Sequence, residues 1–220
     1  MFTVPRRALR TYQDRALRQL ATLAEYTDET TIYAEVPAMS KRGELWLTRT
    51  FSAPRSIAYT VVKFVGDGFI KNHVIIRLLQ SDVKRVQMGM GPKLAILESN
   101  YRISYTGIED LKGRPMYAFA LKPRRKDTDL FKGKILVDSR SGHNVRASGR
   151  LSKSPSLWIK RVDFVQDYVD VGDFTMPAQL QSVGEVRIAG QVVVSIRHLA
   201  YQVRSSPATY AEEPPVESHC

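Results

Sequence analysis

The sequence contains almost no cysteine. Its single cysteine among 220 residues is Cys220, so the chain cannot form an internal disulfide and has no cysteine cluster for a metal ion. A chain of this length buries enough apolar surface to fold without such cross-links. Because cysteine-poor proteins occur in both the cytosol and the periplasm, the scarcity does not identify a compartment.

Long apolar runs are also missing. No stretch of eighteen apolar residues occurs, so the sequence predicts no transmembrane helix. The first twenty residues have neither a continuous apolar core nor an A-x-A cleavage site, and they do not read as a signal peptide. Two locations stay open: the cytosol, or the periplasm after removal of a signal peptide.

Motifs for catalysis and metal binding are absent as well. No G-x-S-x-G or S-x-x-K arrangement indicates a serine nucleophile, and GMGPKL at 89–94 lacks the G-K-[ST] of a phosphate-binding loop. The four histidines have no second histidine or cysteine at ligand spacing: His73, His143, His198 and His219. We therefore expect no catalytic residues, no metal site, no cofactor and no enzymatic activity.

Positive charge is what the sequence has in excess. Lysine and arginine number 33 against 22 acidic residues, a net charge of +11. Residues 122–161 alone hold twelve basic and three acidic residues. Within 117–138, YAFALKPRRKDTDLFKGKILVD, two alternating apolar runs flank a basic tip. Such an excess favours nucleic acid, anionic lipid or an acidic protein as partner.

The distribution of aromatic residues argues against nucleic acid. A single-strand binding platform interleaves aromatic and basic side chains on one strand face. Here the aromatics of 101–119 alternate with small or polar residues, and the basic residues gather in turns. We expect the basic tip to be a hairpin end that contacts an anionic membrane surface or an envelope protein partner.

Hydrophobic periodicity predicts two helices and a long β region. Residues 6–26 repeat apolar side chains at steps of three and four, typical of an amphipathic helix. Residues 72–88 show a partial helical stripe that ends at GMGPK. The other segments alternate with period two or are rich in β-branched and aromatic residues: 30–38, 43–51, 55–65, 100–108, 116–123, 133–139, 144–152, 156–171, 174–190 and 191–203.

These strands follow one another with short turns, which indicates an antiparallel meander rather than βαβ units. We predict an α+β fold, mainly β, in which one curved antiparallel sheet carries the N-terminal and mid-chain helices over its concave face. A single domain spans residues 1–204. Residues 205–220, rich in proline and glutamate, are predicted to be a disordered tail.

Nearly every predicted strand has one strongly apolar face, as in Tyr117, Phe119 and Leu121. In a single curved layer these faces line the concave side. If two helices fill that volume incompletely, an apolar groove suited to lipid or an acyl chain remains. If they fill it, the faces form an ordinary core. Periodicity does not distinguish the two.

The order of several motifs resembles the LolA-type periplasmic lipoprotein carriers and the wider outer-membrane lipoprotein-sorting family. GELWLTR at 43–49, followed by a proline and SIAY, resembles the second-strand region of the carriers. YAFALKP…GKILVDSRSGHNVR and GDFTMPAQLQS resemble the C-terminal half of the family. The resemblance extends over 6–203. It implies an open half-barrel of antiparallel strands with helices as a lid over an apolar cavity.

The resemblance also implies a function. It implies non-enzymatic periplasmic binding of lipid or lipoprotein acyl chains in outer-membrane lipoprotein sorting, with the signal peptide removed. The alternative is a regulatory or envelope-stress interaction protein on the same fold without transported cargo. Carriers have an arginine on the second strand that contacts the lid, and Arg49 matches it. Carriers place a proline directly after this arginine, whereas here TFSA precedes Pro54.

Candidate lipid-binding residues follow from this arrangement. The expected lid face consists of Ile75, Leu78 and Leu79. The expected cavity wall consists of aromatic side chains: Trp46, Phe51, Tyr59, Phe64, Tyr105, Tyr117 and Phe119. Strict alternation puts Trp46 opposite its apolar neighbours and Phe64 off the face of Tyr59, so not all seven can belong to one wall.

Overall fold

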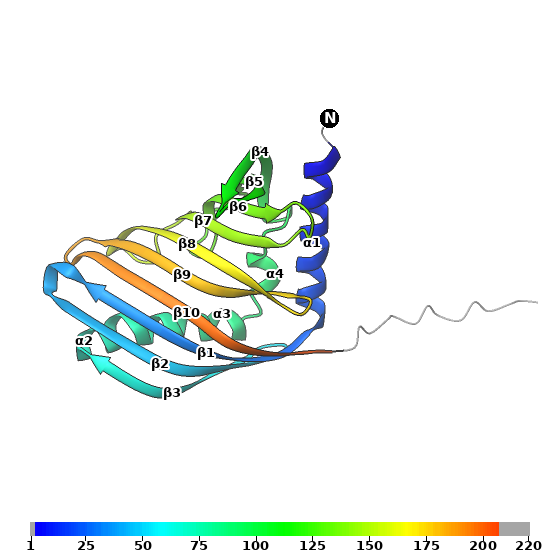
Figure 1. Ribbon diagram of the computed structural model, residues 1–220. Coiled ribbons are helices and arrows are strands. Elements are labelled where there is room, and N and C mark those ends of the chain that lie inside the picture. The colour runs from blue at the N-terminus through cyan, green and yellow to red at the C-terminus, as the bar shows by residue number, and fades with distance from the viewer. Residues whose placement is uncertain (1–2, 207–220) are drawn as a thin grey trace, which may run out of the picture.

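The fold is one ten-stranded antiparallel sheet with helical segments on its hollow side (Figure 1). The computed structural model describes residues 3–206. The strands are β1 Leu23–Val36, β2 Lys41–Ser52, β3 Ser56–Gly66, β4 Tyr101–Leu111, β5 Arg114–Pro123, β6 Phe131–Asp138, β7 Asn144–Leu151, β8 Ile159–Val171, β9 Phe174–Val186 and β10 Gly190–Ser205. The helical segments are α1 Thr3–Thr22, η1 Pro37–Met39, α2 Gly68–Ile70, η2 Lys71–Ile75, α3 Ile76–Gln87 and α4 Gly91–Leu94.

The sheet is open, because its edge strands do not pair with each other. The strand order is β3-β2-β1-β10-β9-β8-β7-β6-β5-β4. The edges β3 and β4 are consecutive in sequence, so the chain between them, residues 67–100, runs from one edge to the other. The predicted fold class, a curved antiparallel half-barrel with helices over its concave face, is confirmed.

The alternating pattern of the sequence separates the two faces of the sheet. In β1 every second residue from Asp28 to Val36 is buried and points to the concave side, while the residues between them are more exposed and point outward. Strand β2 repeats the pattern, with Leu45 and Leu47 inward. Apolar alternation therefore defines the inside of the half-barrel.

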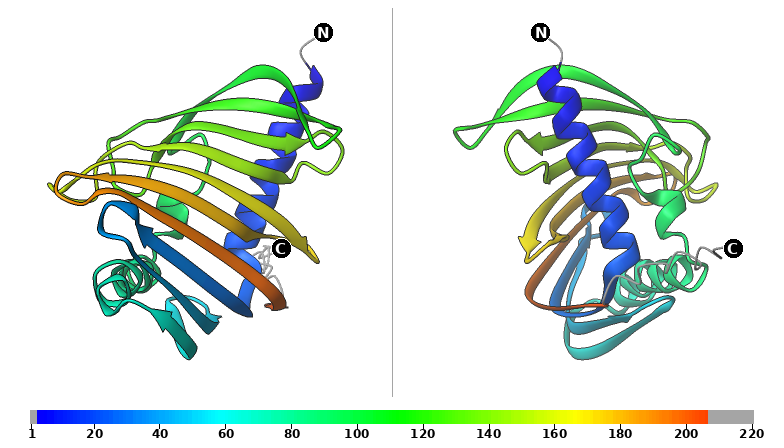
Figure 2. Two further views of the ribbon diagram at one scale, coloured as in Figure 1. Left: turned by 60° about the vertical axis from the view of Figure 1, so that its left-hand side comes forward. Right: turned by 90° about the vertical axis from the view of Figure 1, so that its right-hand side faces the viewer.

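Two apolar cores fill different parts of the concave side. Figure 2 shows the helices beside these two parts of the sheet, with α1 against one and the mid-chain helices against the other. One lies on β4 to β8 around Phe119 and Ile135, and Leu9 of α1 packs against it. The other lies on β1, β2 and β10, where Ile70 and Ile75 are completely buried. We call α2, η2 and α3 together, Gly68–Gln87, the lid segment. The lid segment covers the second core and α1 covers the first.

Helix α1 also packs along one end of the sheet. The Gln19 side chain donates to the Thr175 carbonyl at 3.1 Å and accepts from the Thr175 amide at 2.9 Å. Arg15 donates to the carbonyl of Asp173, in the β8–β9 turn, at 3.0 Å. The opposite end carries the β1–β2, β5–β6, β7–β8 and β9–β10 connections, because antiparallel neighbours turn at alternate ends. We call this end the open rim.

Several predicted boundaries were wrong. The helix expected over 6–26 ends at Thr22, because the chain from Leu23 onward pairs with β10. The mid-chain helix begins earlier than 72, at Gly68, since the Asp67 carboxylate caps it by accepting from the Phe69 amide at 2.7 Å. The strand expected over 174–190 ends at Val186, and α4 was not predicted.

The tail prediction falls largely outside the described residues. Strand β10 continues to Ser205, one residue into the segment predicted as tail. Residues 207–220 are not described. Along the part that is described, no helix combines the length and apolar character needed to span a membrane.

Candidate lipid-binding cavity

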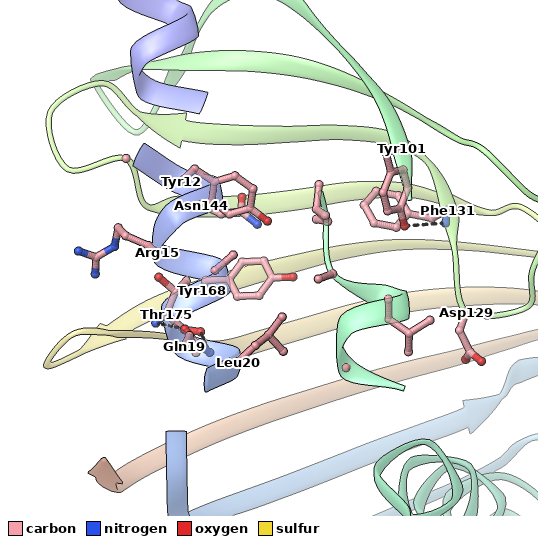
Figure 3. Close-up of a pocket in the computed structure, with 16 residues that line it drawn as sticks. Tyr12, Arg15, Gln19, Leu20, Tyr101, Asp129, Phe131, Asn144, Tyr168 and Thr175 are labelled. Carbon is pink, nitrogen blue, oxygen red and sulfur yellow. Dashed lines mark hydrogen bonds between the residues drawn. The ribbon is translucent and has the colours of Figure 1, made fainter. Parts of the chain in front are cut away.

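A cavity of about 290 Å³ lies between α1, the α4 region and the concave face of the sheet (Figure 3). Its aromatic lining comes from α1 and from three strands: Tyr12, Tyr101, Phe131 and Tyr168. Leu20, Leu94 and Ile96 add aliphatic surface. The volume lies just below the range of about 300–1,000 Å³ that is usual for small-molecule sites. An apolar concave site of this kind suits a hydrocarbon chain.

Two tyrosine hydroxyls supply polarity inside this cavity. The side chains of Tyr12 and Tyr168 point into it in Figure 3, and neither hydroxyl forms a hydrogen bond with another residue of 3–206. The hydroxyl of Tyr101, in contrast, accepts from the Phe131 amide at 3.4 Å. Burial raises the pKa of Tyr12 well above its ordinary value and that of Tyr168 to about 12. Both phenols are therefore neutral hydrogen-bond donors at neutral pH.

Positive charge does not reach into the cavity. Of the described residues that line it, Arg15 alone is basic, and its side chain points away in Figure 3 and donates to a backbone carbonyl of the β8–β9 turn. Asp129 lines the far side, and its carboxylate accepts from Arg85 of α3 at 2.9 Å. The interior therefore favours a neutral, mostly apolar ligand over an anionic headgroup.

Helix α3 forms polar contacts with the edge strand β3 and with the β5–β6 connection at the open rim. The hydroxyl of Tyr59, on the edge strand β3, donates to Asp82 at 2.5 Å. Arg85, one turn later, reaches Asp129 in the β5–β6 connection. None of the residues of α3 is fully buried. The lid segment also contains the π-helical turn η2, a distortion that is frequent at functional sites. Helix α3 is thus held by partly exposed polar contacts together with partly buried apolar packing, such as that of Leu79 on the second core.

A charged cluster lies buried on the concave face beside this lid. Arg49 Nε donates to Asp28 Oδ1 at 2.7 Å, and Arg49 also donates to the Tyr201 hydroxyl at 3.0 Å. The second Asp28 oxygen accepts from Thr30 at 2.6 Å and lies 2.9 Å from His198 Nδ1. Every charge in the cluster therefore has a partner inside the protein, as burial requires.

The cluster shifts the pKa values of its members. Burial alone would raise the pKa of the Asp28 carboxyl, but hydrogen bonds from its neighbours, His198 first, and the charge of Arg49 hold that pKa below its ordinary value. Burial lowers the pKa of His198, and the hydrogen bond with Asp28 only partly opposes this. At neutral pH the imidazole is neutral, and its Nδ1–H tautomer donates to the carboxylate.

The structure places Arg49 differently from the expectation. Its side chain is buried on the concave face, but its hydrogen bonds go to Asp28 and Tyr201, which both belong to the sheet. The hydrogen bond from sheet to lid comes instead from Tyr59, the residue paired with Arg49 on β3. Arg49 therefore supports the strand that holds the lid.

None of the ten candidate lipid-binding residues lines the 290 Å³ cavity. Trp46 lies on the convex face, where the Lys63 ammonium sits 5.5 Å from its ring centroid. Phe51 points inward and stacks on Tyr26. Strict alternation misplaced Phe64: a β-bulge between positions 61 and 63 shifts the register, and Phe64 packs on the second core.

The other candidates lie in the two cores or at their margins. Ile75 and Leu79 belong to the second core, whereas Leu78 of the expected lid face is 36% exposed. The aromatic group of Tyr105, Tyr117 and Phe119 packs edge-on or tilted, with Phe119 fully buried in the first core. Tyr59, the remaining candidate, makes the contact to α3 described above.

The cavity residues that sequence reasoning missed carried a weak signal. Tyr12 belongs to the apolar stripe of the N-terminal helix, and Tyr101 to the apolar face of its strand. Periodicity identifies such residues as inward-facing but does not show where packing leaves space. The space here depends on α4, which the sequence pattern did not predict.

Comparison with known proteins gives similarity to solved structures only, since no family model and no curated protein matches the chain. A domain from Vibrio parahaemolyticus assigned to outer-membrane lipoprotein sorting has 9% identity and a TM-score of 0.46, and the match covers 91% of this chain and 93% of that one. A DUF1329 family protein from Desulfovibrio piger has 11% identity and a TM-score of 0.44, and the match covers 89% of this chain and 92% of that one.

A LolA superfamily protein from Nitrosomonas europaea is similar over 90% of this chain and 94% of its own, with 10% identity and a TM-score of 0.40. The likeness is one of fold.

Proposed function

We propose that this protein binds an acyl chain of a lipid or lipoprotein in the cavity beneath α1, without catalysing a reaction. The observation that carries the proposal is the 290 Å³ cavity, whose wall is largely aromatic and aliphatic. Burying an acyl chain there contributes about 0.8 kcal/mol for each methylene removed from water. Affinity then grows with chain length until the cavity is full.

The two tyrosine hydroxyls give the site a polar anchor. Tyr12 and Tyr168 are neutral donors without a protein acceptor among the described residues, so they suit the carbonyl oxygen of an ester or amide-linked acyl group. No cation points inward among the described residues of the lining, which favours this neutral group over a free carboxylate in the interior.

A role in outer-membrane lipoprotein sorting, and a periplasmic location, belong to the same proposal. Their support is the order of the sequence motifs over 6–203, which resembles the LolA-type carriers. A carrier must also release its cargo, which requires a cover that opens at low cost. Helix α1 covers the cavity, and a few side-chain hydrogen bonds from Arg15 and Gln19 to the β8–β9 end form part of its attachment.

A cavity-filling substitution tests the binding site. Ala16 lines the cavity from α1, and Ala21 on the same helix is exposed. Ala16→Phe should abolish binding of a fluorescent acyl probe because the ring occupies the ligand volume. Ala21→Phe is the matched control and should bind as the parent chain does.

Circular dichroism should show the same fold in both variants. Equal probe affinity in Ala16→Phe, Ala21→Phe and the parent chain would place the ligand elsewhere. A folded parent chain that binds no probe at all fits the regulatory alternative, in which the half-barrel carries no cargo.

A further inference from the structure

Three large apolar side chains protrude from the open rim. Leu157 is 91% exposed, Trp158 60% and Ile188 81%. They lie together, because the Arg187 amide donates to the Trp158 carbonyl at 2.9 Å and the Arg187 guanidinium donates to the Leu157 carbonyl at 3.0 Å. The β7–β8 connection and the β9–β10 turn thus form one structure, which we call the apolar tip. Among the described residues, nothing covers these three side chains enough to bury them.

A basic groove of about 960 Å³ lies on the convex side next to this rim. Its lining includes basic residues from β4, β5, the β5–β6 connection, β6 and β7: Arg102, Lys122, Arg124, Arg125, Lys126, Lys132 and Arg150. The one carboxylate in the lining, Asp163, accepts from Arg150 at 2.8 Å. Arg125 lies 3.6 Å from the Asp127 carboxylate. The other five basic residues form no ion pair within residues 3–206, so the groove carries an excess of positive charge.

Like charges face each other across neighbouring strands in this groove. Arg102 pairs in register with Lys122, and Lys132 with Arg150. Directly opposed like charges destabilise a sheet. Along residues 3–206, no carboxylate forms an ion pair with Arg102, Lys122 or Lys132. A bound polyanionic surface would relieve the repulsion that the protein leaves uncompensated.

We propose that the open rim docks onto a bilayer that contains anionic phospholipid, with the apolar tip in the headgroup layer and the basic groove against the phosphates. Tryptophan and aliphatic side chains partition into the membrane interface, and clustered lysine and arginine residues are attracted to anionic headgroups. Both features occur at one end of the sheet. A soluble phosphate or a nucleic acid would satisfy the groove but leave the apolar tip in water.

This docking surface is separate from the proposed acyl site. No residue of the apolar tip, and none of the basic residues of the groove, lines the cavity. The β5–β6 connection carries residues of both, since Asp129 faces the cavity and Arg124 to Lys126 face the groove. Docking onto a membrane therefore does not require that an acyl chain binds beneath α1, and the two can be tested separately.

Vesicle flotation of the full chain tests the proposal. We expect the protein to float with vesicles of phosphatidylcholine and phosphatidylglycerol at low salt and not with phosphatidylcholine alone. Binding should weaken as salt rises, because salt screens exposed charges. In a Trp46→Phe background, emission of the remaining tryptophan, Trp158, should shift to shorter wavelength on binding, since its ring leaves water.

Two variant pairs separate the contributions. Lys122→Glu with Lys132→Glu, and Leu157→Ser with Ile188→Ser, should each reduce flotation at least tenfold. Ile108→Ser with Leu199→Ser is the matched control, because Ile108 and Leu199 are 63% and 60% exposed away from the open rim, and this pair should float normally.

Three results would overturn the proposal. The first is no flotation with anionic vesicles, and the second is normal flotation of both the charge pair and the apolar pair. The third is loss of flotation in the charge pair alone. The last would indicate a purely electrostatic ligand. Retention of an acidic protein or of single-stranded DNA without flotation would likewise assign the groove to that partner.

Discussion

At the scale of single residues, the most constrained group is the buried cluster around Asp28. A charge inside a protein is tolerated when ion pairs and hydrogen bonds replace its water shell. Here one carboxylate serves Arg49, Thr30 and His198 at distances of 2.6 to 2.9 Å. Removing that carboxylate would leave the Arg49 cation buried without a charged partner. The cluster therefore fixes β1, β2 and β10 relative to one another at the place where the lid segment is attached.

His198 makes the stability of this cluster dependent on pH. Its pKa in the folded protein lies below the ordinary value of 6.5, so the unfolded chain takes up the proton first as pH falls. The stabilisation is complete above about pH 6.5 and is lost progressively below it. The lowered pKa of Asp28 also makes the folded protein less stable as pH falls, but this loss begins only near the ordinary carboxyl pKa of 3.8.

We therefore expect the urea midpoint of unfolding to decrease when the pH is lowered from 7.5 to 5.5. The decrease should be smaller in His198→Gln, because glutamine cannot take up this proton. The slope with pH is the relevant readout, because the substitution also removes hydrogen bonds and lowers stability at every pH. His73→Gln, at an exposed position, should keep the parent slope. An unchanged slope in His198→Gln would show that His198 is not the titrating group.

At the scale of elements, two polar contacts and a partly buried apolar face hold α3. Tyr59→Phe removes the hydroxyl that donates to Asp82 and leaves the ring in place. We expect faster amide hydrogen exchange across Ile76–Gln87, because a local opening loses one of its restraints, and little change elsewhere.

Tyr33→Phe is the matched control for this measurement. It removes a similar hydrogen bond, to Glu35 at 2.7 Å, from the convex face of β1. It should leave α3 unaffected. Equal protection of α3 in the parent chain and in Tyr59→Phe would mean that apolar packing alone holds the lid.

Elements also show where sequence reasoning succeeded and where it did not. Alternation identified the strands because each has one face in the core, as in β1 and β2. It failed at Leu23, where apolar spacing continues the helical stripe but pairing with β10 decides the structure. It failed at Phe64 because a bulge adds one residue to β3, and the side chains after the bulge point to the opposite face from the one that strict alternation predicts.

At the scale of the whole molecule, the meander of strands with short turns was sufficient to predict an open curved sheet with helices inside it. The candidate site was not predictable in the same way. A cavity is the difference between the volume enclosed and the volume filled, and that difference depends on how α1 and α4 sit against the sheet. No periodic pattern in the chain encodes it.

The most direct test of the central claim is native mass spectrometry of the protein purified from cells under gentle conditions. We predict a population carrying the added mass of an acyl lipid, and loss of that population in Ala16→Phe but not in Ala21→Phe. A clean mass of the protein alone, obtained under conditions that preserve lipid complexes of other proteins, would contradict acyl-chain binding.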